Sequence, residues 1–173
     1  MGDHDVTRSG TAPAELIAQL TEPIDGATVV EKQQASSDAT YFMVSVPPEA
    51  WVDIVAAAKD AGFDLFIDLG AVDHFREAPR FEVIVNLVHM AANVRMLVST
   101  RVPYDAPVVP TLTDLFAGAN FYEREAYDLL GIEFEGHPDL TRILMPDDWE
   151  GHPLRKDFGV GDIPVEFKEG QRA

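Results

Sequence analysis

The sequence predicts an α+β domain, with one mixed sheet of four to five strands, helices on one face, and an extended irregular C-terminal segment. Two observations predict this class. Segments that alternate apolar and polar residues, as half-buried strands do, are separated by segments of helical periodicity. After residue 131 the periodicity stops, and Pro and Gly recur. We therefore divide the 173 residues into a disordered arm (1–13), an α+β domain (14–131) and an extended tail (132–173).

The first part of the domain is predicted to contain a strand pair. Residues 14–20 can form one or two helical turns. Residues 27–34 and 40–46 have strand character, with clear alternation in the second segment, and the sequence ASSDA between them supplies a turn.

A helix with one buried face is predicted at residues 47–62. It begins with Pro, ends at Gly62, and carries apolar residues at i, i+3, i+4 and i+7, namely Trp51, Ile54, Val55 and Ala58. A strand follows at 63–69, with Phe63, Leu65, Ile67 and Leu69 on one side. A strand, a helix and a strand of these lengths predict a right-handed crossover between parallel strands.

The second part of the domain is predicted to be a hairpin followed by helices. Residues 80–90 and 93–102 form two antiparallel strands with one buried face each. Residues 103–110 are an extended connector stiffened by Pro, and residues 111–117 a short helix.

A second helix is expected at residues 121–130, ended by Gly131. Asn120 and Glu123 have the spacing of a capping box, in which Glu123 bonds back to the Asn120 amide. One face of this helix is predicted to join the core through Tyr122, Ala126, Leu129 and Leu130. Arg124 and Asp128 are i, i+4 neighbours on another face, which residue physics alone predicts to be solvated.

Composition excludes several functions. The chain has 30 acidic and 13 basic residues, a net charge of -17, so we expect neither nucleic-acid binding nor adsorption to anionic membranes. The absence of cysteine excludes disulfides, thiolate nucleophiles and Cys-ligated zinc or iron–sulfur clusters. No apolar run approaches the roughly 20 residues of a transmembrane helix. The polar N-terminus resembles neither a secretory signal nor a transit peptide, which predicts a cytoplasmic location.

The tail contains Gly-His-Pro twice, around His137 and His152. These histidines could bind a metal with Asp139, Asp147 or Asp148, act as acids or bases, or fix turns together with Pro138 and Pro153. Catalytic zinc needs three protein ligands, and no third histidine is near in the sequence. The tail also lacks a nucleophile motif, and the chain lacks a nucleotide-binding loop. We therefore favour turn formation, and keep a stand-alone His/carboxylate metal enzyme as the second hypothesis.

The tail is rich in large apolar residues for a segment without periodicity. An exposed group of this kind typically marks a protein interface. The residues are Ile143, Leu144, Met145, Trp149, Leu154 and Phe158.

Residues 121–158, FYEREAYDLLGIEFEGHPDLTRILMPDDWEGHPLRKDF, resemble the signature block of a known family. This family comprises the C subunits, of the 30 kDa type, of proton-pumping NADH:quinone oxidoreductase, which is respiratory complex I. Glu-Arg-Glu, Tyr-Asp-Leu, Gly-Ile and both Gly-His-Pro elements carry the resemblance. Phe121 stands where the family often has Trp, and MPDDW fills a variable spacer.

The resemblance implies a non-catalytic subunit of the peripheral arm, on the cytoplasmic side of the cell membrane. It would pack against the large D-type quinone-site subunit, beside the iron–sulfur subunits. FMN, iron–sulfur clusters and quinone would be held by other subunits, with no cofactor in this chain. The block also resembles subunits of membrane-bound hydrogenases and formate hydrogenlyase, of archaeal dehydrogenases for the reduced deazaflavin coenzyme, and of plastid-type ferredoxin:plastoquinone reductase.

The predicted partner interface follows from the resembling block. Arg155 is the best candidate for a desolvated contact with a partner carboxylate, because its guanidinium can bind bidentately while Lys156 is a point charge. The predicted interface residues are Glu123, Arg124, Asp128, His137, Pro138, Arg142, Trp149, His152, Pro153, Leu154, Arg155, Lys156 and Asp157.

Overall fold

A computed structural model describes residues 12–33 and 40–159. Its centre is a five-stranded mixed sheet with the order β1-β2-β5-β4-β3, in which β2 and β5 are parallel and the other neighbours antiparallel. The strands are β1 (Thr28–Gln33), β2 (Thr40–Ser45), β3 (Leu65–Asp73), β4 (Phe81–His89) and β5 (Val94–Val102). The α+β prediction is confirmed. The arm predicted at residues 1–13 lies mostly outside the described residues, as does the ASSDA turn.

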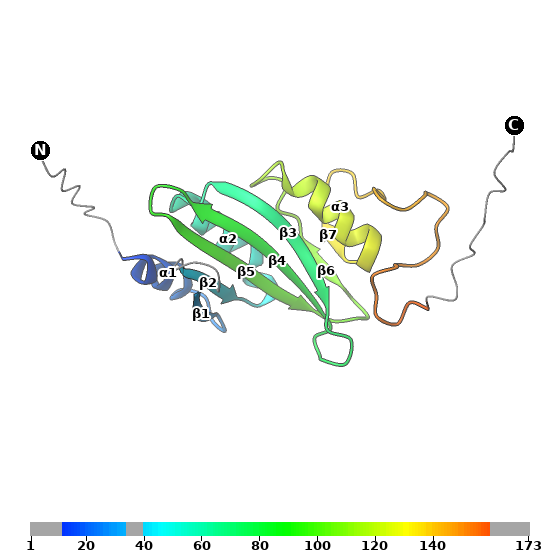
Figure 1. Ribbon diagram of the computed structural model, residues 1–173, viewed down its shortest axis with the longest axis horizontal. Coiled ribbons are helices and arrows are strands. Elements are labelled where there is room, and N and C mark those ends of the chain that lie inside the picture. Colours follow the sequence, from blue (N-terminus) through cyan, green and yellow to red (C-terminus); the bar gives the residue numbers. More distant parts are fainter. Residues whose placement is uncertain (1–11, 34–39, 160–173) are drawn as a thin grey trace, which may run out of the picture.

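Helices cover one face of this sheet (Figure 1). The helix α2 (Trp51–Asp60), preceded by the short 3-10 helix η1 (Pro48–Ala50), lies behind the sheet in that view, and α1 (Pro13–Thr21) packs on α2 and β1. The four residues predicted to form the buried face of α2 are all buried. The strands β2 and β3 run in the same direction, as the crossover predicts, but β5 and β4 lie between them.

The predicted face of β3 is wrong in part. Phe63 and Leu69 are buried, whereas Leu65 and Ile67 are exposed. A register shift between Phe66 and Asp68 is the cause, because one extra residue reverses which side chains face the core.

The connector between the sheet and the last helix also differs from prediction. Residues 111–117 form turns instead of a short helix. The connector includes a short strand, β6 (Val108–Pro110), which pairs in parallel with β7 (Glu133–Glu135). This pairing is non-local, since β6 and β7 lie on opposite sides of a helix in the sequence.

That helix is α3 (Ala119–Leu130), which packs beside β3. Gly131 ends it in the left-handed conformation, with φ of 72°, as predicted. The predicted capping box is wrong: the N-cap position is Gly118, and no side chain caps the helix. Glu123 turns inward instead, where it accepts the Leu112 amide.

Candidate docking tail and its anchors

Two acidic residues of α3 are fully buried, which the sequence does not predict. Glu123 and Asp128 both have 0% exposure. The predicted solvated face of Arg124 and Asp128 is therefore wrong, and Tyr122, predicted to be core, is exposed. Since a buried charge is costly unless it is paired and hydrogen-bonded, the partners of these carboxylates define the site.

The Asp128 carboxylate holds the tail through backbone amides. Its Oδ2 accepts hydrogen bonds from the amides of Ile143 (3.0 Å), Leu144 (2.7 Å) and Met145 (2.8 Å), and its Oδ1 from Arg142 Nη1 (2.6 Å). Burial alone would raise the pKa of Asp128. These hydrogen bonds to the ionised form outweigh it and lower the pKa to about 2.

Two arginines extend this attachment along the tail. Arg142 also donates to the carbonyls of Asp128 and Gly151, at 3.1 Å each. Arg124 donates to the Thr141 carbonyl and hydroxyl and to the Arg142 carbonyl. The tail between residues 141 and 151 is thus fixed to α3 by charged side chains rather than by secondary structure.

The two Gly-His-Pro histidines bond to backbone groups. The Asp139 amide donates to Nδ1 of His137 (3.0 Å), which leaves Nε2 as the donor to the Asn120 carbonyl (3.3 Å). Nδ1 of His152 donates to the Asp128 carbonyl (3.0 Å). Burial lowers the pKa of His152, so its neutral form is favoured. Within residues 12–33 and 40–159 no group of three or more His, Cys, Asp or Glu side chains is placed to hold a metal ion.

Glu123 fixes the connector rather than the tail. Its Oε1 accepts the Leu112 amide (2.7 Å) and its Oε2 accepts the Thr111 hydroxyl, while His137 Nε2 lies 4.0 Å from Oε2. No described cation neutralises it by direct contact. Burial raises the pKa of Glu123 to about 7, against the opposing effect of the two hydrogen bonds.

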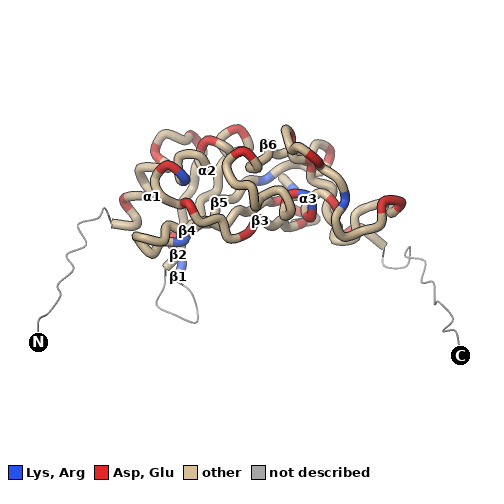
Figure 2. The backbone as a smooth tube through the Cα atoms, turned by 90° about the horizontal axis from the view of Figure 1, so that it is seen from above, with Lys and Arg blue, Asp and Glu red and all other residues tan. Residues whose placement is uncertain are grey.

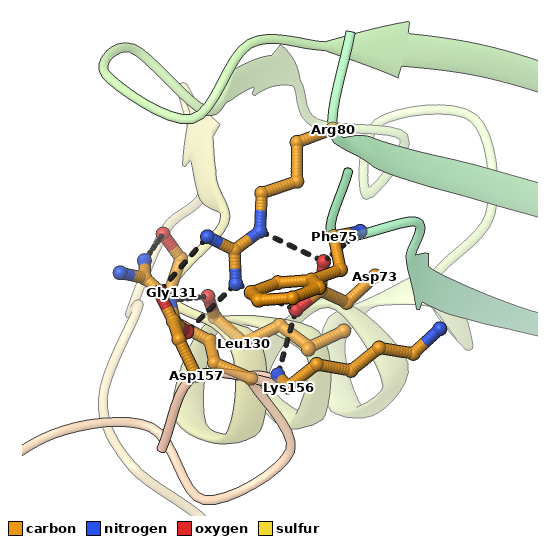
Figure 3. A network of polar contacts seen from close by, with 8 residues as sticks. Asp73, Phe75, Arg80, Leu130, Gly131, Lys156 and Asp157 are labelled. Atoms are coloured by element: carbon orange, nitrogen blue, oxygen red, sulfur yellow. Dashed lines mark hydrogen bonds and ion pairs between the residues drawn. The ribbon is translucent and has the colours of Figure 1, made fainter. Parts of the chain in front are cut away.

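The end of the tail is held by a second ionic network, centred on Arg80 (Figure 3). Arg80 binds Asp73 through Nε and Nη2 (2.8 Å each) and Asp157 through Nη1 (2.9 Å) and Nη2 (2.7 Å). The Lys156 amide donates to Asp73 Oδ2 (2.8 Å). The Arg80 hydrogen bonds hold the pKa values of Asp73 and Asp157 below their usual range. Arg80 and Asp73 are not predicted from the sequence, because their separation from Asp157 in the chain gives no local signal.

Arg155 makes its described contacts inside the chain. Its Nε donates to the Leu130 carbonyl (2.6 Å) and its Nη2 to the Gly131 carbonyl (3.4 Å), at the C-terminus of α3. The guanidinium carbon also lies 5.3 Å from the Phe81 ring centroid and 5.5 Å from that of Tyr104. A partner carboxylate for Arg155 stays a prediction, but the structure gives this side chain a capping role within the chain.

The predicted interface residues differ in burial, and the exposed group includes Asp157, which also anchors the tail through Arg80. Glu123 and Asp128 are buried. Arg124, His137, Arg142, Trp149, His152, Pro153 and Arg155 are partly buried, and Pro138, Leu154, Lys156 and Asp157 are exposed.

Large apolar side chains face outward around the anchors. Leu144 is 59% exposed, Leu154 is 58% exposed, and Phe121 and Ile143 are also exposed. Trp149 stacks on Phe158 with ring centroids 6.4 Å apart, and its buried indole N–H has no hydrogen-bond partner among the described residues.

Residues 44–163 match the family model described as "Respiratory-chain NADH dehydrogenase, 30 Kd subunit". The chain belongs to this family. It is 41% identical over 160 residues to the C subunit of the NADH-quinone oxidoreductase of Roseiflexus sp. (strain RS-1), covering 86% of this chain and 92% of that one. It is 43% identical over 137 residues to the corresponding C subunit of Thermus thermophilus (strain ATCC BAA-163), covering 74% and 66% respectively. The resemblance seen in the sequence is confirmed.

Two solved structures are similar to this chain and support the same family assignment. The trypsin-resistant fragment of Nqo5 is similar with a TM-score of 0.64 at 32% identity, over 74% of this chain and 99% of the fragment. A chain of the membrane-bound sulfane sulfur reductase, an archaeal respiratory membrane complex, is similar with a TM-score of 0.73 at 25% identity, over 91% and 96%. In the described part of this family member, no helix has the length and apolar character needed to cross a membrane.

Proposed function

We propose that this chain is a non-catalytic subunit of the peripheral arm of an NADH:quinone oxidoreductase, and that its tail docks on the large quinone-site subunit. One observation carries the proposal: an irregular segment is fixed to the domain by buried carboxylates while its large apolar side chains face outward. Ordering such a segment is costly in entropy, and long ordered irregular segments are usually functional. Exposed apolar groups on this scale typically form interfaces.

In this role the chain positions its neighbours and carries no electrons itself. FMN, iron–sulfur clusters and quinone are then held by other subunits, which accords with a chain that has no cysteine for a cluster. Electron transfer from NADH to quinone depends on this subunit only through assembly. The same role places the chain on the cytoplasmic side of the cell membrane, as a peripheral component beside the iron–sulfur subunits.

The docking surface can be tested with lysine substitutions in the full chain. Leu144→Lys and Leu154→Lys each remove an outward apolar group, and burying a leucine typically contributes about 1.5–3 kcal/mol. Both variants should keep the melting temperature of the isolated chain, because the side chains are exposed in it. Retention in the purified complex should fall at least about tenfold, since about 1.4 kcal/mol is a factor of ten.

Met90→Lys is the matched control, because Met90 is 64% exposed and lies in the β4–β5 turn. It should assemble like the wild type. Equal assembly of all three variants would show that the tail does not dock through these residues. A flavin or iron absorbance in the isolated chain would contradict the non-catalytic role.

A second candidate is the equivalent subunit of a related membrane complex. The similarity to a chain of the sulfane sulfur reductase, which covers 91% of this chain, supports it. Identifying the proteins that co-purify with the full chain separates the two: a flavoprotein that oxidises NADH supports the first candidate.

A further inference from the structure

The face of the sheet opposite α2 carries eight apolar residues among polar ones, which include Asp68 and Glu82. In β4 the residues Phe81, Val83, Val85 and Leu87 are buried toward the helices, so the alternate positions of each strand face the other way. No described element lies in front of this open face in Figure 1. An open face of a mainly antiparallel sheet is typically polar. Here its apolar residues are Val30, Tyr41, Met43, Leu65, Val72, Ile84, Val88 and Leu97.

Three of these residues form a row across β1, β2 and β5, and on β4 this row continues with the polar residue Asn86. Val30, Met43 and Leu97 are successive partners on β1, β2 and β5. Residues directly opposite each other on one face have Cβ atoms about 5 Å apart, so this row of three residues is one contact surface. Val30 is 51% exposed, and Met43 and Leu97 are partly exposed.

Basic residues border this surface at both ends. Lys32 and Arg95 flank Tyr41 in one row, since Lys32 pairs with Tyr41 and Tyr41 with Arg95. Blue Lys and Arg positions lie near β1 and β2 in Figure 2, as they also do around α3, while the whole chain has a net charge of -17. Arg101 lies at the other end of β5, on the same face as Arg95.

A recess of about 340 Å³ adjoins the Arg101 end, lined by hydroxyls of β1, β2 and β5 and by prolines. Among the described residues Arg101 Nε has no hydrogen-bond partner there, and the Thr100 hydroxyl has none either, although Thr100 pairs with Val83 and so lies on the helix-facing side. Arg101 Nη2 lies 3.5 Å from Glu77 Oε2, at the limit of a hydrogen bond, and Glu82 is its cross-strand partner. Unpaired buried polar atoms cost stability, which a partner's polar group would recover.

We infer that the open sheet face binds an amphipathic helix of another protein, apolar along the contact and acidic at both ends. Acidic side chains complement Lys32 and Arg95 at one end, and a side chain entering the recess pairs with Arg101 at the other. Arg95 and Arg101 are six residues apart on one strand, about 20 Å, which corresponds to about 13 residues of α-helix. This surface is separate from the tail and does not depend on it.

Physical arguments favour a helix over other occupants. An extended segment across the central strands would bring unpaired backbone groups onto an apolar surface, whereas a helix satisfies its own. A second copy of this chain is disfavoured by area. Five strands about 4.8 Å apart, six residues long in β1 and β2 and nine residues long in β3, β4 and β5, give a face of roughly 600 Å², against about 800 Å² per partner in a standard stable interface.

The test is site-specific photocrosslinking in the assembled complex, with Leu97→p-benzoylphenylalanine in the full chain and mass spectrometry of the crosslinked peptides. The expected crosslink joins Leu97 to an amphipathic segment of another protein with acidic residues at its ends. Arg95→Glu should lower its yield about tenfold, since reversing a contact charge weakens docking. Arg76→Glu is the control, because Arg76 is exposed in the loop between β3 and β4.

Other outcomes overturn the inference. A crosslink to a second copy of the chain or to its own termini would contradict it. A crosslink to a segment of another protein that is rich in Lys and Arg would also contradict it. A yield no higher than that of the same probe at exposed Glu49 would show that the face is only solvated. A parallel probe at Leu144 reports on the tail, so failure at Leu97 is distinguishable from failure of the proposed function.

Discussion

Buried Asp128 and partly buried Arg142 form an ion pair in which Asp128 Oδ1 lies 2.6 Å from Arg142 Nη1. The pair joins α3 to a tail segment 14 residues further along the chain. The other carboxylate oxygen of Asp128 accepts three successive backbone amides of the same segment. One side chain thus fixes both the position and the conformation of the tail.

Asp128→Ala should release this segment. It leaves Arg142 and three amides without their acceptor, and removing one partner of a buried pair typically costs about 3–5 kcal/mol. We expect native-state hydrogen exchange to show lost protection of the Ile143, Leu144 and Met145 amides. Asp139→Ala, in an exposed part of the same tail, should change stability by less than about 0.5 kcal/mol. Unchanged protection in Asp128→Ala would contradict the anchor role.

The contacts of the ionised carboxylates that fix the tail should weaken in acid. The pKa of Asp128 is lowered from 3.8 to about 2 in the folded chain, so its ionised form stabilises the fold. This stabilisation is complete above pH 4 and is lost as the pH falls through about 2. Asp73, whose pKa is also lowered, adds to the loss in the same direction. Urea unfolding at several pH values measures this loss of stability. A free energy of unfolding that stays constant between pH 5 and pH 2 would contradict the prediction.

Glu123 should have the opposite pH dependence. Its pKa is raised from 4.5 to about 7, so the folded chain favours the protonated form. The contribution of Glu123 to the free energy of unfolding is fully present below pH 4.5. It decreases by about 3 kcal/mol as the pH rises to about 7. Glu123→Gln keeps the shape of the neutral acid and should abolish this slope. A slope retained in Glu123→Gln would assign it to another group.

Arg80→Lys should detach the end of the tail. The guanidinium binds Asp73 and Asp157 with four hydrogen bonds, a geometry that a single ammonium group cannot reproduce. We expect a loss of about 3–5 kcal/mol, because Asp73 is buried and loses its bidentate partner. Arg76→Lys, at an exposed neighbouring position, should have no measurable effect on the melting temperature. Equal melting temperatures for both variants would show that the network contributes little.

Gly131→Ala should displace the tail from α3. Gly131 has φ of 72°, and a Cβ there would collide with the side chains of His152 and Arg155. We expect loss of assembly together with altered hydrogen exchange around the Leu154 amide, which donates to the Leu129 carbonyl. Gly70→Ala is the control, because no heavy atom lies within 4 Å of a Cβ at that position. Normal assembly of Gly131→Ala would show that the tail tolerates displacement.

The sequence by itself determined the sheet, the buried face of α2 and the end of α3. These features depend on local periodicity and on single residues with special backbone conformations, such as Gly131. It also determined the family, because residues 121–158 form one contiguous block. The alternation of apolar and polar residues in β4 and β5 was sufficient to predict these two strands, because that pattern is local too.

Tertiary structure alone decided what the charged residues do. Asp128 was expected on a solvated face because helical periodicity records only hydrophobicity, whereas its burial depends on Arg142 and on amides supplied by a distant segment. Arg80 and Asp157 are 77 residues apart, and the pairing of β6 with β7 is also non-local. A one-residue bulge in β3 likewise moved Leu65 and Ile67 outward. Such outcomes depend on which segments meet, and no local pattern encodes that.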